Sequence, residues 1–450
     1  MRKPETSATV VGVTLLLKFS SHSHNLAQVL MAKFRRPSRY KEMIASFSIF
    51  LYLLLIIGIK GGFAIGIAGL WGLGCYVWIF RLKPQMDQGS VWTITVFVIY
   101  FLINVALNLY HQDFLREYDL PFRYLLSILV FIALSHFRPS QDAFWIGLSL
   151  GSIFGVLSII NTREHMLNGD PVRGVAHLGN ISMIVGLMCF SGWRWALDKS
   201  KSRGVWILMV LLGGVSGIVG SVLTGTRGAW LAVPPVMIIY LIDLARFFKW
   251  PLYRVFAVAI VCLAAILWTF QHNQIINSRF SRAVIETRLF FNPESGAAEH
   301  AEDTSVGQRW FMWKNAIHMI QLKPILGWGK RDYLDYKNKR IIEGQVHPQI
   351  AKYTDAHNDY IDATVKIGVL GLVSLLLVYL VPMMLFVKRY LRDYGLVQGL
   401  SLSAIVMITG YMVSGLTATF MTINMNVMFY TVTVAVLFSL IETQTRSSDS

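Results

Sequence analysis

Long apolar runs constrain this chain more than any other feature. Several approach or exceed the roughly 20 residues that a helix needs to cross the hydrocarbon core of a bilayer. Of the 450 residues, 54% are hydrophobic and only 15% are charged, whereas about 25% are charged in a typical soluble protein. A transmembrane β-barrel would show short alternating segments instead of continuous runs. The sequence therefore predicts an all-α, polytopic integral membrane protein.

The apolar runs predict about twelve transmembrane helices, and the basic residues predict their orientation. A basic cluster ends the N-terminal segment, and alternate short connections on the same side carry most of the other lysines and arginines. Because basic residues in short loops favour the cytoplasm, we expect both termini there. The expected spans are 44–59, 62–80, 91–109, 122–137, 143–161, 177–196, 204–223, 228–245, 252–270, 357–386, 395–418 and 421–441.

The chain shows no internal repeat or linker, so we expect one membrane domain with short appendages. Residues 1–43 are expected to form an uncleaved, basic cytoplasmic segment. Residues 44–441 would form the transmembrane catalytic domain, and 442–450 a cytoplasmic tail. A polar segment between spans 9 and 10, residues 271–356, is expected to be a large periplasmic loop.

One stretch of this loop, "TSVGQRWFMWKNAIHMIQLKP" (304–324), has apolar residues at helical spacing. Trp310, Trp313, Ile317 and Ile320 would lie on or near one face. The pattern predicts a helix that lies on the membrane or packs over the bundle.

The net charge of +16 does not indicate nucleic-acid binding, since the chain has no soluble basic domain. The three cysteines lie inside apolar runs and lack metal-ligand spacing. There is no Walker motif, no dinucleotide fingerprint and no metal triad in the sequence. We therefore expect chemistry without a cofactor or metal.

An arginine stands between two apolar runs in "SVLTGTRGAWLAV" (221–233). Arg227 precedes a helix expected from Gly228, whose first amides already present positive charge. A cation there is unfavourable unless an anion shares the site, and the guanidinium fork matches phosphate oxygens. Flanking glycines, Gly225 and Gly228, would let a ligand approach the backbone. The alternative is an interfacial arginine that reaches lipid headgroups.

Three further arginines are expected on the same outer side. Arg173 lies before the sixth span, Arg123 at the mouth of the fourth and Arg309 on the loop helix. Each alone is explained by a salt bridge, such as Arg173 with Asp170, or by a headgroup contact. Together they are able to converge on one strongly anionic group, such as a pyrophosphate.

A second polar cluster, "YTDAHNDYIDATVKIG" (353–368), begins the tenth span. If it is helical, the helix N-terminus keeps His357 neutral and able to accept a proton. Asp355 or Asp359 would oppose that effect or fix the ring tautomer. The alternative is that the cluster only caps the helix, with Asp355 or Asn358 as the N-cap.

Three motifs in this order resemble the O-antigen ligase and polymerase superfamily of bacterial envelopes. They are "LTGTRGAWLA", "SVGQRWFMWKNAIHMIQLKPILGWG" and "DAHNDYIDATVKIGVLGL", and the likeness covers roughly residues 170–380. The resemblance implies an inner-membrane glycosyltransferase with its active site on the periplasmic face. A ligase of this kind transfers a glycan from undecaprenyl pyrophosphate to lipid A-core in lipopolysaccharide biosynthesis, without a nucleotide sugar or metal.

The resemblance also implies roles for individual residues. His357 would be the general base, Arg227 and Arg309 would be catalytic, and Arg173 would contact phosphate together with Arg227. Arg123 has no firm counterpart and rests on its charge and position. Asn358 and Asp359 are expected to support the histidine.

Three other functions remain open at this point. An O-antigen polymerase uses the same carrier but joins repeat units to one another. A protein O-glycosyltransferase of the same superfamily usually carries a larger soluble C-terminal region. A membrane transporter would suit twelve spans, but the two halves show no correspondence and most span interiors lack the charges that coupling needs.

Overall fold

The computed structural model describes residues 39–167, 175–272, 281 and 305–448, and the described chain contains helices and no strand. This confirms the all-α class. The helices are α2 (Arg39–Leu55), α3 (Phe63–Ile79), α4 (Gln88–Tyr110), α5 (Asp119–His136), α6 (Gln141–Leu167), α7 (Val175–Phe190), α8 (Trp193–Asp198), α9 (Arg203–Thr224), α10 (Arg227–Trp230), α11 (Val233–Phe247), α12 (Leu252–His272), α15 (Ser305–Leu322), α16 (Lys330–Ile342), α17 (Asp359–Arg392), α18 (Gly395–Ser414) and α19 (Asn424–Ser448), with short 3₁₀ turns η1 (Leu115–Tyr118), η3 (Pro348–Lys352) and η4 (Phe420–Thr422).

Within the described ranges, eight helices are long and apolar enough to cross a membrane. They include α4, α6, α9, α18 and α19, and the chain is therefore a multi-pass membrane protein. Helices also occupy the other expected spans, but α3 is shorter than a full crossing. The count of twelve spans stays a prediction.

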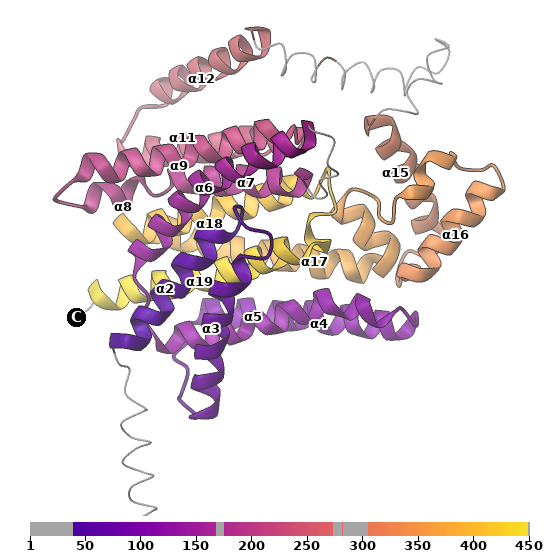
Figure 1. Ribbon diagram of the computed structural model, residues 1–450, viewed down its shortest axis with the longest axis horizontal. Coiled ribbons are helices and arrows are strands. Elements are labelled where there is room, and N and C mark those ends of the chain that lie inside the picture. Colours follow the sequence, from indigo (N-terminus) through magenta and orange to yellow (C-terminus); the bar gives the residue numbers. More distant parts are fainter. Residues whose placement is uncertain (1–38, 168–174, 273–280, 282–304, 449–450) are drawn as a thin grey trace, which may run out of the picture.

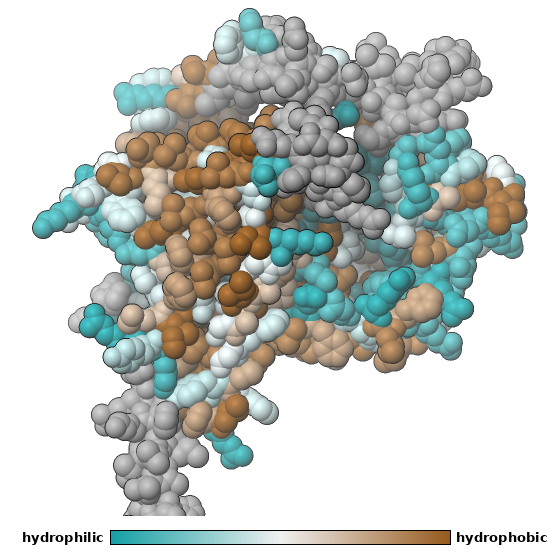
Figure 2. Space-filling model, in the orientation of Figure 1, coloured by the Kyte–Doolittle hydropathy of each residue, from teal (hydrophilic) through white to brown (hydrophobic). Residues whose placement is uncertain are grey.

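Among the eight candidate spans, the last two of the chain are the most deeply packed. In α19, 89% of the apolar window is buried inside the protein, and in α18 72%, against 28–56% in the other candidate spans. The outer helices instead expose large apolar side chains, which give the bundle the hydrophobic surface seen in Figure 2. Bilayer-facing helices need this pattern because lipid solvates their outer faces.

Helices α15 and α16 gather at one end of the bundle, beside the start of α17, and the C-terminus lies at the other end (Figure 1). Hydrophilic residues cover much of the surface at the α15–α16 end (Figure 2). We call this the loop end of the bundle. The part of the expected loop before residue 305 lies outside the described residues, apart from Ser281 and the last residues of α12.

At the opposite end, a buried ion pair ties three helices together. Arg194 Nη2 of α8 lies 2.5 Å from Asp243 Oδ1 of α11, and the Tyr390 hydroxyl of α17 donates to the same oxygen over 2.9 Å. Both charged side chains are almost fully buried. Removing one partner would leave an uncompensated buried charge, so this cluster fixes the packing of α8, α11 and α17.

The helix α17 is broken close to the loop end. Gly368 has φ +73° and ψ −169°, a conformation that interrupts the helix. The loop before α16 fits against the break, where Trp328 N donates to Val365 O over 3.0 Å and Gly329 N donates to Lys366 O over 2.8 Å. Residues 359–367 thus form a separate short helix beside the loop end.

Two sequence expectations differ in detail from the structure. The span expected from Gly228 is present as the candidate span Arg227–Phe247, in which a first turn, α10, is followed by α11 from Val233, with Pro234 and Pro235 in the first turn of α11. In α15 the buried face is formed by Met312, Ala316 and Met319, while Ile317 is 49% exposed.

Candidate functional site

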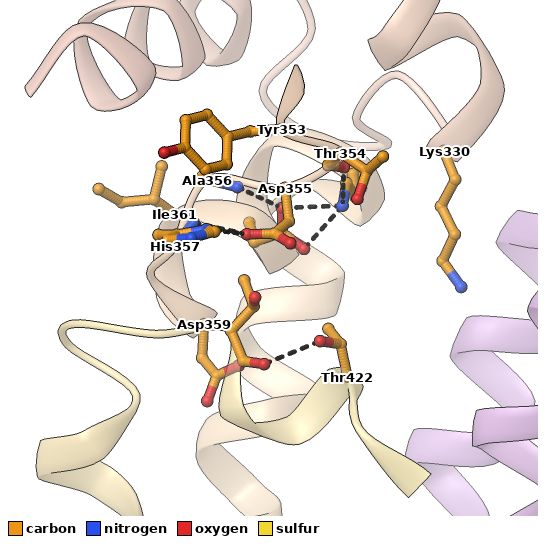
Figure 3. A network of polar contacts seen from close by, with 12 residues as sticks. Lys330, Tyr353, Thr354, Asp355, Ala356, His357, Asp359, Ile361 and Thr422 are labelled. Carbon is orange, nitrogen blue, oxygen red and sulfur yellow. Dashed lines mark hydrogen bonds and ion pairs between the residues drawn. The ribbon is translucent and has the colours of Figure 1, made fainter. Parts of the chain in front are cut away.

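The candidate site is built around an imidazole–carboxylate pair. His357 Nδ1 lies 2.6 Å from Asp355 Oδ1, and the His357 amide donates to the same oxygen over 2.9 Å. Figure 3 shows the ring facing the carboxylate. A carboxylate can only accept hydrogen bonds, so Nδ1 carries the proton and Nε2 is left as the basic nitrogen. The imidazole is about one third exposed, at 33%.

The environment of Asp355 keeps its carboxyl ionised. Burial alone would raise the pKa of Asp355, but the hydrogen bond and charge of His357, together with the charge of Lys366, hold it well below the ordinary value. Asp355 therefore fixes the tautomer of His357, one of two assignments that the sequence left open. The other candidate, Asp359, is engaged elsewhere.

His357 lies outside the helix that the sequence predicted for it. The helix begins at Asp359, and Asn358 is its N-cap, accepting from Tyr360 N and Ile361 N over 3.0 Å each. His357 has φ +49°, in the left-handed region that few residues other than glycine adopt. Such conformations cluster at functional sites because surrounding contacts must hold them. The capping alternative is thus confirmed for Asn358, and it leaves the imidazole of His357 outside the helix.

Two buried lysines hold the segment that precedes this pair. Lys337 Nζ donates to the carbonyls of Ile350 and Ala351 over 3.3 Å each, and also to Tyr353 O. Lys366 Nζ donates to Thr354 O over 3.1 Å.

The partner of Lys366 anchors the same segment from another side. Lys366 forms an ion pair with Asp362 at 2.9 Å, and Asp362 Oδ1 accepts from Ala356 N over 3.0 Å. Residues 350–356 are thus held by cations and a carboxylate from α16 and α17. A lysine inside an otherwise apolar stretch was the sequence signal for Lys366, but spacing alone did not link it to His357.

Asp359 fixes the connection between α18 and α19. Its carboxylate accepts from Met421 N over 3.0 Å, and its amide donates to Gly415 O over 2.8 Å. Asn358 Nδ2 also donates to Leu416 O over 2.9 Å. The two expected supporting residues thus dock the start of α17 onto this connection.

The same connection also contacts the segment that bears Arg227. A Cβ added at Gly228 would lie 2.2 Å from Thr417 Oγ1, so α10 approaches the connection very closely. Gly228 is needed here for that close approach. Gly228 and Asn358, the neighbours of Arg227 and His357, therefore contact one short stretch, residues 415–419, although they lie 130 positions apart in the sequence.

Arg309 belongs to a helix that is bonded to the histidine segment. On α15, Gln308 accepts from the Tyr353 hydroxyl, and Trp313 Nε1 donates to Ala356 O over 2.9 Å. The Tyr353 ring in turn packs edge-on against the His357 ring, with centroids 4.9 Å apart. Arg309 lies between these two anchors, one helical turn before Trp313.

The structure does not link the other two expected arginines, Arg123 and Arg173, to His357. Arg123 on α5 forms an i,i+4 ion pair with Asp119 at 2.8 Å, the salt bridge that was its alternative explanation. No described contact links it to His357. Arg173 lies outside the described residues.

A second imidazole lies near the pair and was not assigned to the site from the sequence. His177, near the start of α7, interacts electrostatically with His357 and Asp355. Two residues later, a Cβ at Gly179 would lie 2.3 Å from Thr226 Oγ1, next to Arg227. The sequence signal was its position at the outer end of the sixth expected span, the same side as His357.

This geometry can perform proton abstraction by an imidazole. An imidazole oriented by a carboxylate is a general base in its neutral form, and guanidinium groups placed beside reacting atoms stabilise developing negative charge. Arg227 and Arg309 come from α10 and α15, and the imidazole and the carboxylate come from residues 355–357.

Comparison with known proteins gives the family of this region. Residues 212–376 match the O-antigen ligase family, a segment that contains Arg227, Arg309 and His357. An uncharacterized protein of Haemophilus influenzae is 23% identical over 349 residues, which cover 75% of this chain and 84% of the relative. The family match confirms the resemblance carried by the three sequence motifs.

Proposed function

We propose that this membrane protein transfers a completed polysaccharide from undecaprenyl pyrophosphate to lipid A-core, because residues 212–376 match the O-antigen ligase family. The site would face the periplasm, since the basic connections at the other end of the bundle favour the cytoplasm. The observation that carries the proposal is the His357–Asp355 pair, 2.6 Å apart, whose neighbour Asn358 contacts the same 415–419 connection as Gly228, next to Arg227.

In the proposed reaction, His357 Nε2 takes the proton of an acceptor sugar hydroxyl. The oxygen attacks the anomeric carbon of the donor glycan, and the bond from that carbon to the pyrophosphate oxygen breaks. Direct displacement inverts the anomeric configuration. Breaking the pyrophosphate linkage supplies the driving force, so the reaction consumes no nucleotide.

The guanidinium groups would stabilise the departing pyrophosphate. Arg227 and Arg309 are the proposed catalytic arginines because α15 is bonded to the histidine segment and α10 contacts the 415–419 connection, which Asn358 also contacts. Arg173 and Arg123 complete the predicted phosphate-binding set. Of these, Arg123 must share its guanidinium with Asp119. Charge stabilisation in a site shielded from water is commonly the largest contribution to catalysis.

Replacing the proposed base gives the first test. His357→Ala is expected to lower glycan transfer by roughly 10²–10⁴-fold, the usual contribution of a general base, while the protein still inserts into the membrane. His272→Ala, at the exposed end of α12, is the matched control and should transfer normally. The assay uses purified protein, carrier-linked donor and lipid A-core, without ATP or an ion gradient. Normal transfer by His357→Ala would remove the histidine from this role.

A deletion strain separates the proposed function from its alternatives. Loss of a ligase leaves bare core and full-length chains on the carrier. Core that bears a single repeat unit would identify a polymerase instead. Purified protein that moves substrate across vesicles but transfers no glycan would identify a transporter.

A further inference from the structure

A groove lies at the end of the bundle opposite the candidate site, between the first turns of α2 and the connection from α5 to α6. Its volume is about 550 Å³, in the range of small-ligand pockets. Arg39, Glu42 and Arg138 line it together with apolar residues, among them Phe47, Phe50 and Ile146. None of these residues belongs to the site described above.

No residue that the structure describes neutralises the charges of the groove. Across the described residues, Arg39 and Arg138 form no ion pair and no side-chain hydrogen bond, and the Glu42 carboxylate accepts none. Lys41, which lies between Arg39 and Glu42, donates to the Tyr76 hydroxyl on α3. Two guanidinium groups and one carboxylate leave the groove with a net charge of +1 from these three residues. A ligand with one negative charge balances it.

The apolar wall of the groove runs along α2, away from this charged rim. From Arg39 to Phe50, α2 rises about 16 Å at 1.5 Å per residue. Phe47 is 60% exposed and its ring stacks beside Phe50, with centroids 6.3 Å apart. A charged rim next to an apolar wall matches an amphipathic lipid, with its phosphate at the guanidinium groups and an acyl chain along the phenylalanines.

The chain that precedes α2 does not suit the groove. It carries Lys33, Arg35 and Arg36 shortly before Arg39, so it would bring like charge to a basic rim. An anionic lipid brings the opposite charge, and its headgroup hydroxyls are able to donate to Glu42.

We propose that this groove binds one anionic phospholipid of the phosphatidylglycerol type, whose phosphate lies between Arg39 and Arg138. The proposal is independent of the glycan-transfer reaction, because the groove and the candidate site are at opposite ends of the bundle. Its chemistry is charge pairing by guanidinium groups plus burial of one acyl chain.

The test is native mass spectrometry of the purified full-length protein released from nanodiscs that contain equal parts of phosphatidylglycerol and phosphatidylethanolamine. The wild type should retain one phosphatidylglycerol in preference to phosphatidylethanolamine. Arg39→Gln with Arg138→Gln should weaken that retention at least about tenfold, as expected for two cation–lipid contacts. Ala143→Trp fills the groove without changing its charge and should abolish retention.

Arg203→Gln is the control, because it removes an exposed basic residue outside the groove. Gel filtration should show all variants as monodisperse. Equal retention of both lipids by the wild type would overturn the charge assignment. If Ala143→Trp still retained phosphatidylglycerol, the placement of its acyl chain in the groove would be wrong. An equal loss of phosphatidylglycerol in Arg203→Gln would show only a general attraction of the lipid to the basic surface.

Discussion

At the scale of single residues, the site depends on how one histidine is held. His357 combines a left-handed backbone, a carboxylate two residues earlier and an aromatic ring against its edge. Asp355 accepts both the backbone and the ring hydrogen of His357 through one oxygen. This orientation leaves Nε2 available, which is the condition for general-base action.

Asp355 should make stability depend on pH. Its pKa in the folded protein lies below the ordinary value, so its stabilising effect is complete above about pH 4 and is lost as the pH falls through the folded pKa. Asp355→Asn lacks this effect. Thermal melting in detergent should therefore show the wild type losing roughly 1 kcal/mol more than the variant between pH 7 and pH 3, with the rest of the loss below pH 3. Parallel curves for the two proteins would contradict the assignment.

At the scale of elements, the site depends on the break in α17. The short helix 359–367 is separated from the span by Gly368, and the loop before α16 occupies the break. A Cβ at Gly368 would lie 2.0 Å from Ile325 O. The break therefore requires glycine at position 368 for two reasons: the left-handed backbone conformation and the close contact with Ile325 O.

Gly368→Ala should destabilise the protein by roughly 1–3 kcal/mol, because the left-handed backbone is strained and the loop must move. Gly72→Ala on α3 is the control, since nothing lies within 4 Å of the added Cβ. That change should be neutral or stabilise by about 0.5–1 kcal/mol. Urea titration of both variants measures the difference, and equal midpoints would show that the break tolerates a side chain.

The buried lysine of α16 gives a second prediction at this scale. Lys337→Met removes the donor for three carbonyls of residues 350–353, so their backbone should open more often. Hydrogen–deuterium exchange of 350–357 should become at least about tenfold faster. Lys339→Met, whose side chain is 68% exposed, is the control and should leave exchange unchanged. Unchanged exchange in Lys337→Met would contradict this prediction and show that Lys366 and Asp362 hold residues 350–357 without Lys337.

At the scale of the whole molecule, the two ends of the bundle differ in chemistry. The loop end carries α15, α16 and the His357–Asp355 pair, and the other end carries the buried Arg194–Asp243 pair and the basic groove. The distribution of basic residues predicts that the second end faces the cytoplasm.

Cysteine labelling measures this orientation. With Cys75, Cys189 and Cys262 replaced by alanine, Lys339→Cys on α16 should react with a membrane-impermeant maleimide in spheroplasts. Lys201→Cys, before α9, should react only after lysis. Both lysines are exposed in the protein. The reverse pattern would place the candidate site in the cytoplasm and exclude a lipopolysaccharide ligase.

The sequence by itself determined the class, the helices and the candidate chemistry of this protein. Apolar runs of membrane length produce helices because lipid cannot satisfy backbone hydrogen bonds. Arginines such as Arg227 and the polar cluster around His357 stood out because charged groups are costly beside apolar spans. The family resemblance came from motifs inside the segment that matches the O-antigen ligase family.

Only the tertiary structure decided which of these groups meet. Gly228 and Asn358, the residues that follow Arg227 and His357, contact one connection, between α18 and α19, that neither motif contains. Asp355, and not Asp359, fixes the tautomer of His357, because the Asp359 carboxylate accepts a hydrogen bond from the amide of Met421, 62 positions away. The spacing of apolar residues predicts which face of a helix is apolar, but it does not predict which other helix packs against that face.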